Sequence, residues 1–143
     1  MATWTKFHSY AARLAQGQLN LATDSIKLAL SNSAPNVATG AVLTDITQIS
    51  AGNGYVAGGF ALAGSAITDV SGLWTRDFSD LVVTASGGAI ADFRYPILFD
   101  DTIANDPLIA FSDLGAVISL SDGESYRFEF NAAGVLTVNA QNA

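Results

Sequence analysis

Apolar residues that alternate with polar ones indicate that this chain is mainly β. In the runs 26–30, 91–95 and 126–130 every second residue is apolar, as in a strand with one buried face. Turn signals such as Ser86-Gly-Gly88 and Ser121-Asp-Gly123 separate the short runs. We therefore predict an antiparallel β-sandwich or small barrel of about seven or eight short strands.

Residues 4–17 have the period of a helix instead. Four apolar residues in this range recur three or four positions apart: Phe7, Tyr10, Ala11 and Leu14. Gly17 would end the helix. We expect one domain, residues 1–143, that carries this N-terminal helix as an arm over about residues 1–17. Residues 42–49 are ambiguous and fit a short helix, with Gly52 after it.

The N-terminal arm has two interpretations. It could pack on its own sheet, as amphipathic helices usually do. It could instead bind a neighbouring subunit, because large aromatics and arginine dominate interface energies. The partner-binding residues predicted by the second interpretation are Trp4, Lys6, Phe7, Tyr10 and Arg13. Deleting residues 1–9 distinguishes the two interpretations. The deletion should unfold the protein only if Phe7 and Tyr10 belong to its own core, as the first interpretation requires.

The stretch from Ala51 to Phe60 is the densest in glycine. Four of its ten residues are glycine, and glycine is needed where the backbone takes positive φ or approaches another segment closely. We predict a shaped crossing here, around which the rest of the chain is organised. A phosphate-binding loop is excluded because no Lys-Ser/Thr pair follows the glycines.

The composition narrows the possible partners. Charged residues make up 13% of the chain, about half the usual share, which indicates that a partner covers some of the surface. A surface rich in small residues is the alternative explanation. The net charge of −7 argues against binding nucleic acid, which needs a basic surface, and against an anionic membrane surface.

No catalytic constellation stands out. His8 is the only histidine and there is no cysteine, so a zinc site is not expected. No serine lies on a nucleophile-elbow pattern. The loop Asp100–Asp106 crowds oxygen ligands that could hold Ca²⁺, but it lacks EF-hand spacing, and such residues also form ordinary turns. We predict a protein that is not an enzyme and has no cofactor or metal.

Six segments together resemble, in the same order, a family of small virion proteins of tailed bacteriophages. They are Asp24–Leu30, Thr44–Ile46, Gly52–Gly59, Arg94–Asp101, Pro107–Ala110 and Phe128–Leu136. The resemblance covers most of the chain, and its motifs are those of turns and strands.

The resemblance implies a non-enzymatic structural protein of the virion, located at the capsid surface. It would be a head decoration (cement) protein, present as a homotrimer, whose partner is the major capsid protein. The alternative is a tail-associated or carbohydrate-binding adhesin protein. That alternative would use exposed aromatics, Trp74 or Tyr55, and an ion in the loop Asp100–Asp106.

Overall fold

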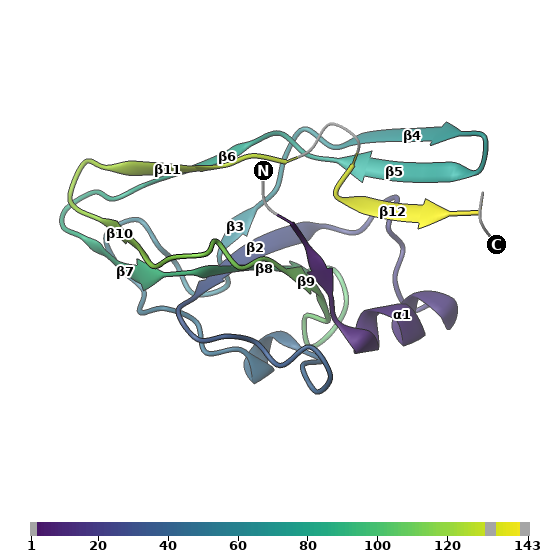
Figure 1. Ribbon diagram of the computed structural model, residues 1–143, viewed down its shortest axis with the longest axis horizontal. Helices are drawn as coiled ribbons and strands as arrows, with labels where there is room; N and C mark the ends of the chain where they lie inside the picture. The colour runs from purple at the N-terminus through teal and green to yellow at the C-terminus, as the bar shows by residue number, and fades with distance from the viewer. Residues whose placement is uncertain (1–2, 131–133, 141–143) are drawn as a thin grey trace.

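The computed structural model describes residues 3–130 and 134–140, which form a two-layered, mainly antiparallel β structure (Figure 1). Its elements in chain order are β1 (Thr5–Lys6), α1 (His8–Ala15), β2 (Ile26–Ser31), the 3₁₀ helix η1 (Leu43–Asp45), β3 (Phe60–Ala61), β4 (Ala66–Val70), β5 (Leu73–Asp77), β6 (Leu81–Thr84), β7 (Ile90–Phe93), β8 (Tyr95–Asp100), β9 (Leu108–Phe111), β10 (Ile118–Leu120), β11 (Ser125–Phe128) and β12 (Leu136–Asn139).

Strands β5 to β12 form one long antiparallel hairpin that is folded in half. Its tip is the loop 101–107, between β8 and β9. From the tip the two arms pair in turn, β8 with β9, β7 with β10, β6 with β11 and β5 with β12. Both arms bend between β7–β10 and β6–β11, yet they stay hydrogen-bonded there: the Ala85 N–H donates to Glu124 O, and Gly123 N–H donates to Ala85 O. The bend makes two stacked layers from one ribbon.

The first half of the chain widens both layers. In the lower layer of Figure 1, β1 pairs with β9 and β2 pairs with β8, which gives a five-stranded sheet in the order β1-β9-β8-β2-β3. In the upper layer β4 pairs with β5, which gives the three-stranded sheet β12-β5-β4. The prediction of an antiparallel β-sandwich with an N-terminal helix is confirmed. The sheets of the described residues do not close into a barrel, so that alternative was wrong.

Apolar side chains fill the space between the layers and a smaller space below the lower one. The main core takes residues from both layers, among them Leu28, Leu30, Val83, Phe93, Leu98 and Phe128. The second core lies on the opposite face of the lower sheet and contains Phe7, Ala29, Leu43, Ile46, Ile97, Phe99 and Leu108. Strands β2 and β8 are therefore buried on both faces, and η1 and the adjoining residues Phe7 and Ile46 help to cover the lower one.

The glycine-rich stretch is the crossing that its sequence predicts. Tyr55 is buried in it, and the Tyr55 hydroxyl accepts a hydrogen bond from Leu30 N–H at 3.1 Å and donates to Gln48 Oε1 at 2.7 Å. Gly59 has a φ of +74°, and a Cβ there would overlap the carbonyl oxygen of Leu28. The Asn53 side-chain amide donates to Ala89 O in the β6–β7 turn. The stretch therefore joins β2 to the bend of the folded hairpin.

Candidate functional site

The N-terminal segment begins as a strand and becomes a helix only at His8. Thr5 pairs with Phe111 and Lys6 with Ala110, so β1 lies along the edge of the lower sheet. Phe7 is extended, with a ψ of 147°, and its N–H donates to Ile109 O at 3.0 Å. The expected helical start at residue 4 was therefore wrong, because these backbone groups bond to β9.

Two of the five predicted partner-binding residues belong to this chain's own core. Phe7 is 1% exposed and lies in the second core, with its ring 5.4 Å from that of Phe111. Tyr10 is 5% exposed and lies in the main core, where burial raises the pKa of its hydroxyl to about 12. Neither side chain is free to reach a neighbouring subunit. The interpretation in which the helix packs on its own sheet accounts for both.

Trp4, Lys6 and Arg13 are the predicted residues that keep some exposure. The ring of Trp4 stacks on Phe130, with 6.0 Å between centroids. The Lys6 ammonium donates to Val135 O at 3.2 Å, and burial lowers its pKa. Trp4 and Lys6 thus tie β1 to the upper layer, while Arg13 is in the last turn of α1. A partner-binding role for these three residues stays a prediction.

A pocket of about 330 Å³ opens beside Trp4, between β11 and the segment that follows β9. Its lining includes the aromatic ring of Tyr126 and the carboxylate of Asp113. Asp113 accepts two hydrogen bonds from Arg94, at 2.7 and 3.1 Å, and these bonds lower the pKa of its carboxyl group. Sequence reasoning missed this pocket because Trp4 and Tyr126 are at opposite ends of the chain.

The acidic loop Asp100–Asp106 does not gather its carboxylates into one site. Asp100 is buried, whereas Asp101 forms a salt bridge with Lys27 at 3.2 Å. Asn105 and Asp106 have positive φ values, 69° and 52°, as turn residues do. Within residues 3–130 and 134–140 no three His, Cys, Asp or Glu side chains lie close enough together to hold a metal ion.

A buried charge cluster joins the two layers near this loop. Asp24, Arg76 and Asp100 are 5%, 7% and 0% exposed, although they come from the segment before β2, from β5 and from β8. Arg76 Nη1 donates to the carbonyl oxygens of Leu21 and Asp24, both at 2.8 Å. Burial lowers the pKa of Arg76, and the carboxylates of Asp24 and Asp100 oppose that effect. Nothing in the local sequence pattern marked these three residues as a group.

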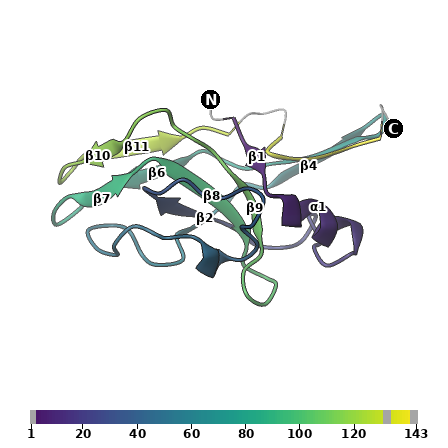
Figure 2. The ribbon, with the colours of Figure 1, turned by 60° about the horizontal axis from the view of Figure 1, so that its bottom comes forward.

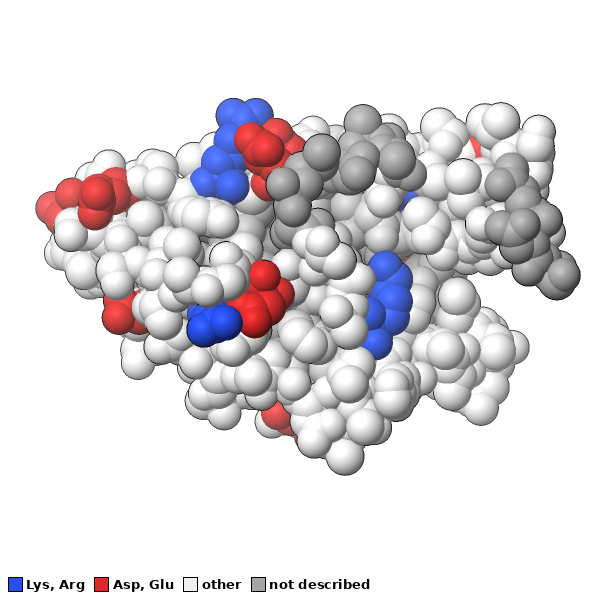
Figure 3. All heavy atoms as spheres, viewed as in Figure 1, with Lys and Arg blue, Asp and Glu red and all other residues white. Residues whose placement is uncertain are grey.

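The sheet β12-β5-β4, called the projecting sheet below, extends past the end of the sandwich (Figures 1 and 2). All five residues of β4 are exposed, and β4 has no strand on its outer edge among the described residues. Ile67, Val70 and Val138 are large apolar residues exposed on this sheet. Figure 3 shows few charged side chains at this end of the molecule on the face in view.

Beneath the projecting sheet is an apolar groove of about 430 Å³, which separates it from α1 and the segment that follows. Trp74 and Val138 line the groove from above, and Leu14, Leu19 and Leu21 line it from below. Trp74, one of the two candidates for an exposed sugar-binding aromatic, is half-buried. Tyr55, the other candidate, is fully buried, so it cannot bind a sugar.

No helix among the described residues has the length and apolar character needed to span a bilayer. Comparison of the chain with known protein families, with curated proteins and with solved structures finds no match in any of the three.

Proposed function

We propose that this chain is a non-enzymatic structural protein of a tailed-phage virion, a decoration protein that binds the major capsid protein as a homotrimer. The observation that carries the proposal is the projecting sheet. Among the residues that the structure describes, it presents an unpaired strand edge and exposed Ile67, Val70 and Val138 in a protein with little charge. Monomeric proteins usually protect such edges with lysine, proline or a bulge. β4 has no lysine or proline and pairs with β5 in unbroken register, and Asp69 is its one charged side chain.

The sequence resemblance to small phage virion proteins supports the proposal that this chain assembles on the virion. The projecting sheet supports contact between copies, because strand-edge pairing adds main-chain hydrogen bonds while apolar side chains are buried. The projecting sheet has few charged side chains, and such a surface can be desolvated at low cost when it is buried in an interface. Trp4, Lys6 and Arg13 are half-buried and lie outside the projecting sheet, and we propose that they face the capsid.

Light scattering of the purified chain tests the self-association. We expect a mass three times that of the 14.8 kDa chain. Replacing both Ile67 and Val70 with lysine should give a monomer with an unchanged fold, because each lysine would place a charge in the interface. The matched control is Val56→Lys, since Val56 is 69% exposed but lies outside the projecting sheet. A trimer that survives the double substitution would exclude the projecting sheet as its interface.

Binding to capsids tests the function itself. Purified chain is mixed with particles that lack decoration proteins, and the bound fraction is measured by sedimentation and cryo-electron microscopy. We expect density at regular positions on the capsid surface. A chain that neither forms oligomers nor binds particles would contradict the proposal, and binding at the tail instead would favour a tail-associated role.

A further inference from the structure

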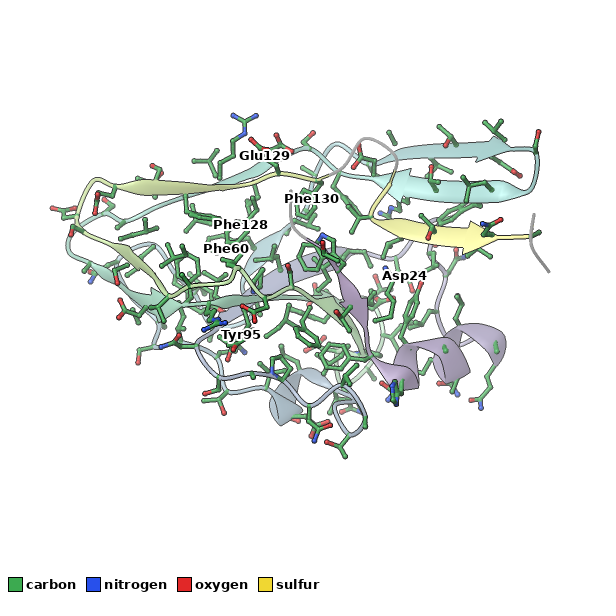
Figure 4. The ribbon with its side chains drawn as sticks, in the orientation of Figure 1. Asp24, Phe60, Tyr95, Phe128, Glu129 and Phe130 are labelled. Carbon is green, nitrogen blue, oxygen red and sulfur yellow. The ribbon has the colours of Figure 1, made fainter. Side chains whose placement is uncertain are left out.

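The buried cluster of Asp24, Arg76 and Asp100 contains more potential negative charge than positive charge. Two carboxyl groups and one guanidinium are each less than a tenth exposed. Figure 4 labels Asp24 in the region between the lower layer, the projecting sheet and α1. A buried charge without a partner is costly. If both carboxyl groups were ionised, the cluster would have a net charge of −1.

The hydrogen bonds of the cluster leave one carboxyl oxygen without a partner. Asp100 Oδ1 accepts from Thr102 N–H at 2.9 Å, whereas Asp100 Oδ2 is buried and has no hydrogen bond within the described ranges. Asp24 Oδ2 accepts from Asn20 N–H at 2.9 Å. The hydrogen bonds that Arg76 makes go to neutral oxygens, including Ser65 Oγ at 2.8 Å. A proton on Asp100 would therefore remove the excess charge and give Oδ2 a donor function.

The other charged groups on the surrounding elements do not supply the missing partner. Lys27 is paired with Asp101 at the rim, and Lys6 donates to Val135 O. Asp77 follows Arg76 along β5, so its side chain points to the opposite face of the sheet. Tyr10 comes from α1, and its buried hydroxyl has no hydrogen bond in the described part of the chain.

The ionisation of Asp100 follows from these surroundings. Burial, and then the neighbouring carboxylate of Asp24, raise the pKa of Asp100 to about 7. Its backbone hydrogen bond from Thr102 acts in the opposite direction but is weaker. The side chain therefore changes charge near neutral pH, far from where an exposed aspartate does.

We propose that Asp24 and Asp100 form a proton-operated latch that holds the projecting sheet to the lower layer. In the protonated form the Asp100 hydroxyl donates to the Asp24 carboxylate, and the single remaining negative charge is balanced by Arg76. Loss of the proton leaves two buried carboxylates that repel each other. The segment 20–24 then loosens, and with it the carbonyl oxygens of Leu21 and Asp24 that hold Arg76 of β5.

Trp74 provides the signal for the test, because it lines the groove between the projecting sheet and the segment 19–22. The background is Trp4→Phe, which leaves Trp74 as the only tryptophan of the two. Trp74 fluorescence is followed from pH 5.5 to 8.5, and we expect one transition with a midpoint near 7. A signal that does not change over this range would overturn the latch.

Three variants separate the latch from other titrations. Asp100→Asn keeps a donor next to Asp24 and cannot ionise, so it should abolish the transition. Asp24→Asn removes the repelling carboxylate and should move the midpoint to lower pH. His8→Gln is the control, because it removes the one histidine of the sequence, and it should change nothing. Loss of the transition in His8→Gln would overturn the proposal.

Two measurements on the unmodified chain keep the proposal testable if a variant fails to fold. A ¹³C NMR titration of the aspartate carboxyl groups should show Asp100 titrating well above the exposed aspartates, and a value among theirs would contradict the latch. Adding Ca²⁺ at pH 8 should not restore the low-pH signal. If it did, the cluster would be a cation site and the latch would be wrong.

Discussion

Gly59 is where the glycine-rich stretch comes closest to β2. Its φ of +74° lies in the left-handed region, and the carbonyl oxygen of Leu28 occupies the position that a side chain would need. Gly58 has a similar positive φ of +94° but open space around it. Substituting alanine at Gly58 and at Gly59 therefore distinguishes the free-energy cost of backbone strain from that of a steric clash.

Gly59→Ala should lower the free energy of unfolding by about 3 kcal/mol or more, since strain and overlap with β2 add together. Gly58→Ala, the matched control, should cost only about 1 kcal/mol, which is the strain alone. Urea denaturation of both variants measures the difference. Equal costs would mean that the close approach of Gly59 to Leu28 contributes nothing.

The sequence could predict a shaped crossing at these glycines, because positive φ and close approach both select glycine. It could not predict which segments the crossing joins. Leu28 and Ala89 are the contacts of Gly59 and Asn53, and neither is near them in the chain. Likewise, Asp24, Arg76 and Asp100 become one cluster only after three separate elements have packed together.

At the scale of elements, the N-terminal segment shows how hydrogen bonds to a neighbouring strand can delay the start of a helix. The apolar period includes Phe7, but its N–H bonds to Ile109 O across the sheet edge, so Phe7 precedes the helix. Tyr10 and Leu14 keep the helical spacing that the sequence predicts. The contact between Trp4 and Phe130 joins the two halves of the chain, so no local period could reveal it.

Phe7→Ala should lower the free energy of unfolding by about 3–5 kcal/mol, because it empties a site in the second core. Arg13→Ala is the control, and its effect should stay within about 0.5 kcal/mol, as for most surface changes. Thermal melts of both variants measure this. If Phe7→Ala instead melted like the parent but no longer bound capsids, Phe7 would be a partner-binding residue after all.

For the molecule as a whole, folding lowers the pKa of some carboxyl groups and raises that of Asp100. Together these shifts predict that the protein is most stable at a pH below neutral. Hydrogen bonds lower the pKa of three exposed carboxyl groups: Asp45, Asp80 and Asp113. These three groups add to the free energy of unfolding above the ordinary aspartate pKa. Their contribution is lost as the pH falls through their lowered pKa values. Asp100 has a raised pKa, so its contribution is present at low pH and is lost as pH rises towards 7.

Calorimetric melts from pH 3 to 8 should therefore show the highest melting temperature at about pH 4. The decline between about pH 4 and 7 should be absent in Asp100→Asn, while the decline below pH 4 should remain. A profile that rises steadily to pH 8 would contradict the raised pKa of Asp100.

Alternation of apolar and polar residues could predict most strands and the antiparallel class, because each strand has its own local period. The order of the strands followed from contacts across the whole chain. The bend at Ala85 and Gly123 carries hairpin-turn residues on both arms, so the sequence shows two ordinary turns where the structure has one folded ribbon.

The folded hairpin also sets an order for events during synthesis. Closing the short loop 101–107 costs little entropy, and each further pair towards β5 and β12 can then zip onto the last. Strands β1 and β2 pair with strands next to the tip of this ribbon, yet they leave the ribosome before it. Their apolar faces must wait unpaired until the tip has been made. Chaperone dependence, and aggregation of chains halted before residue 111, are the costs expected of this arrangement.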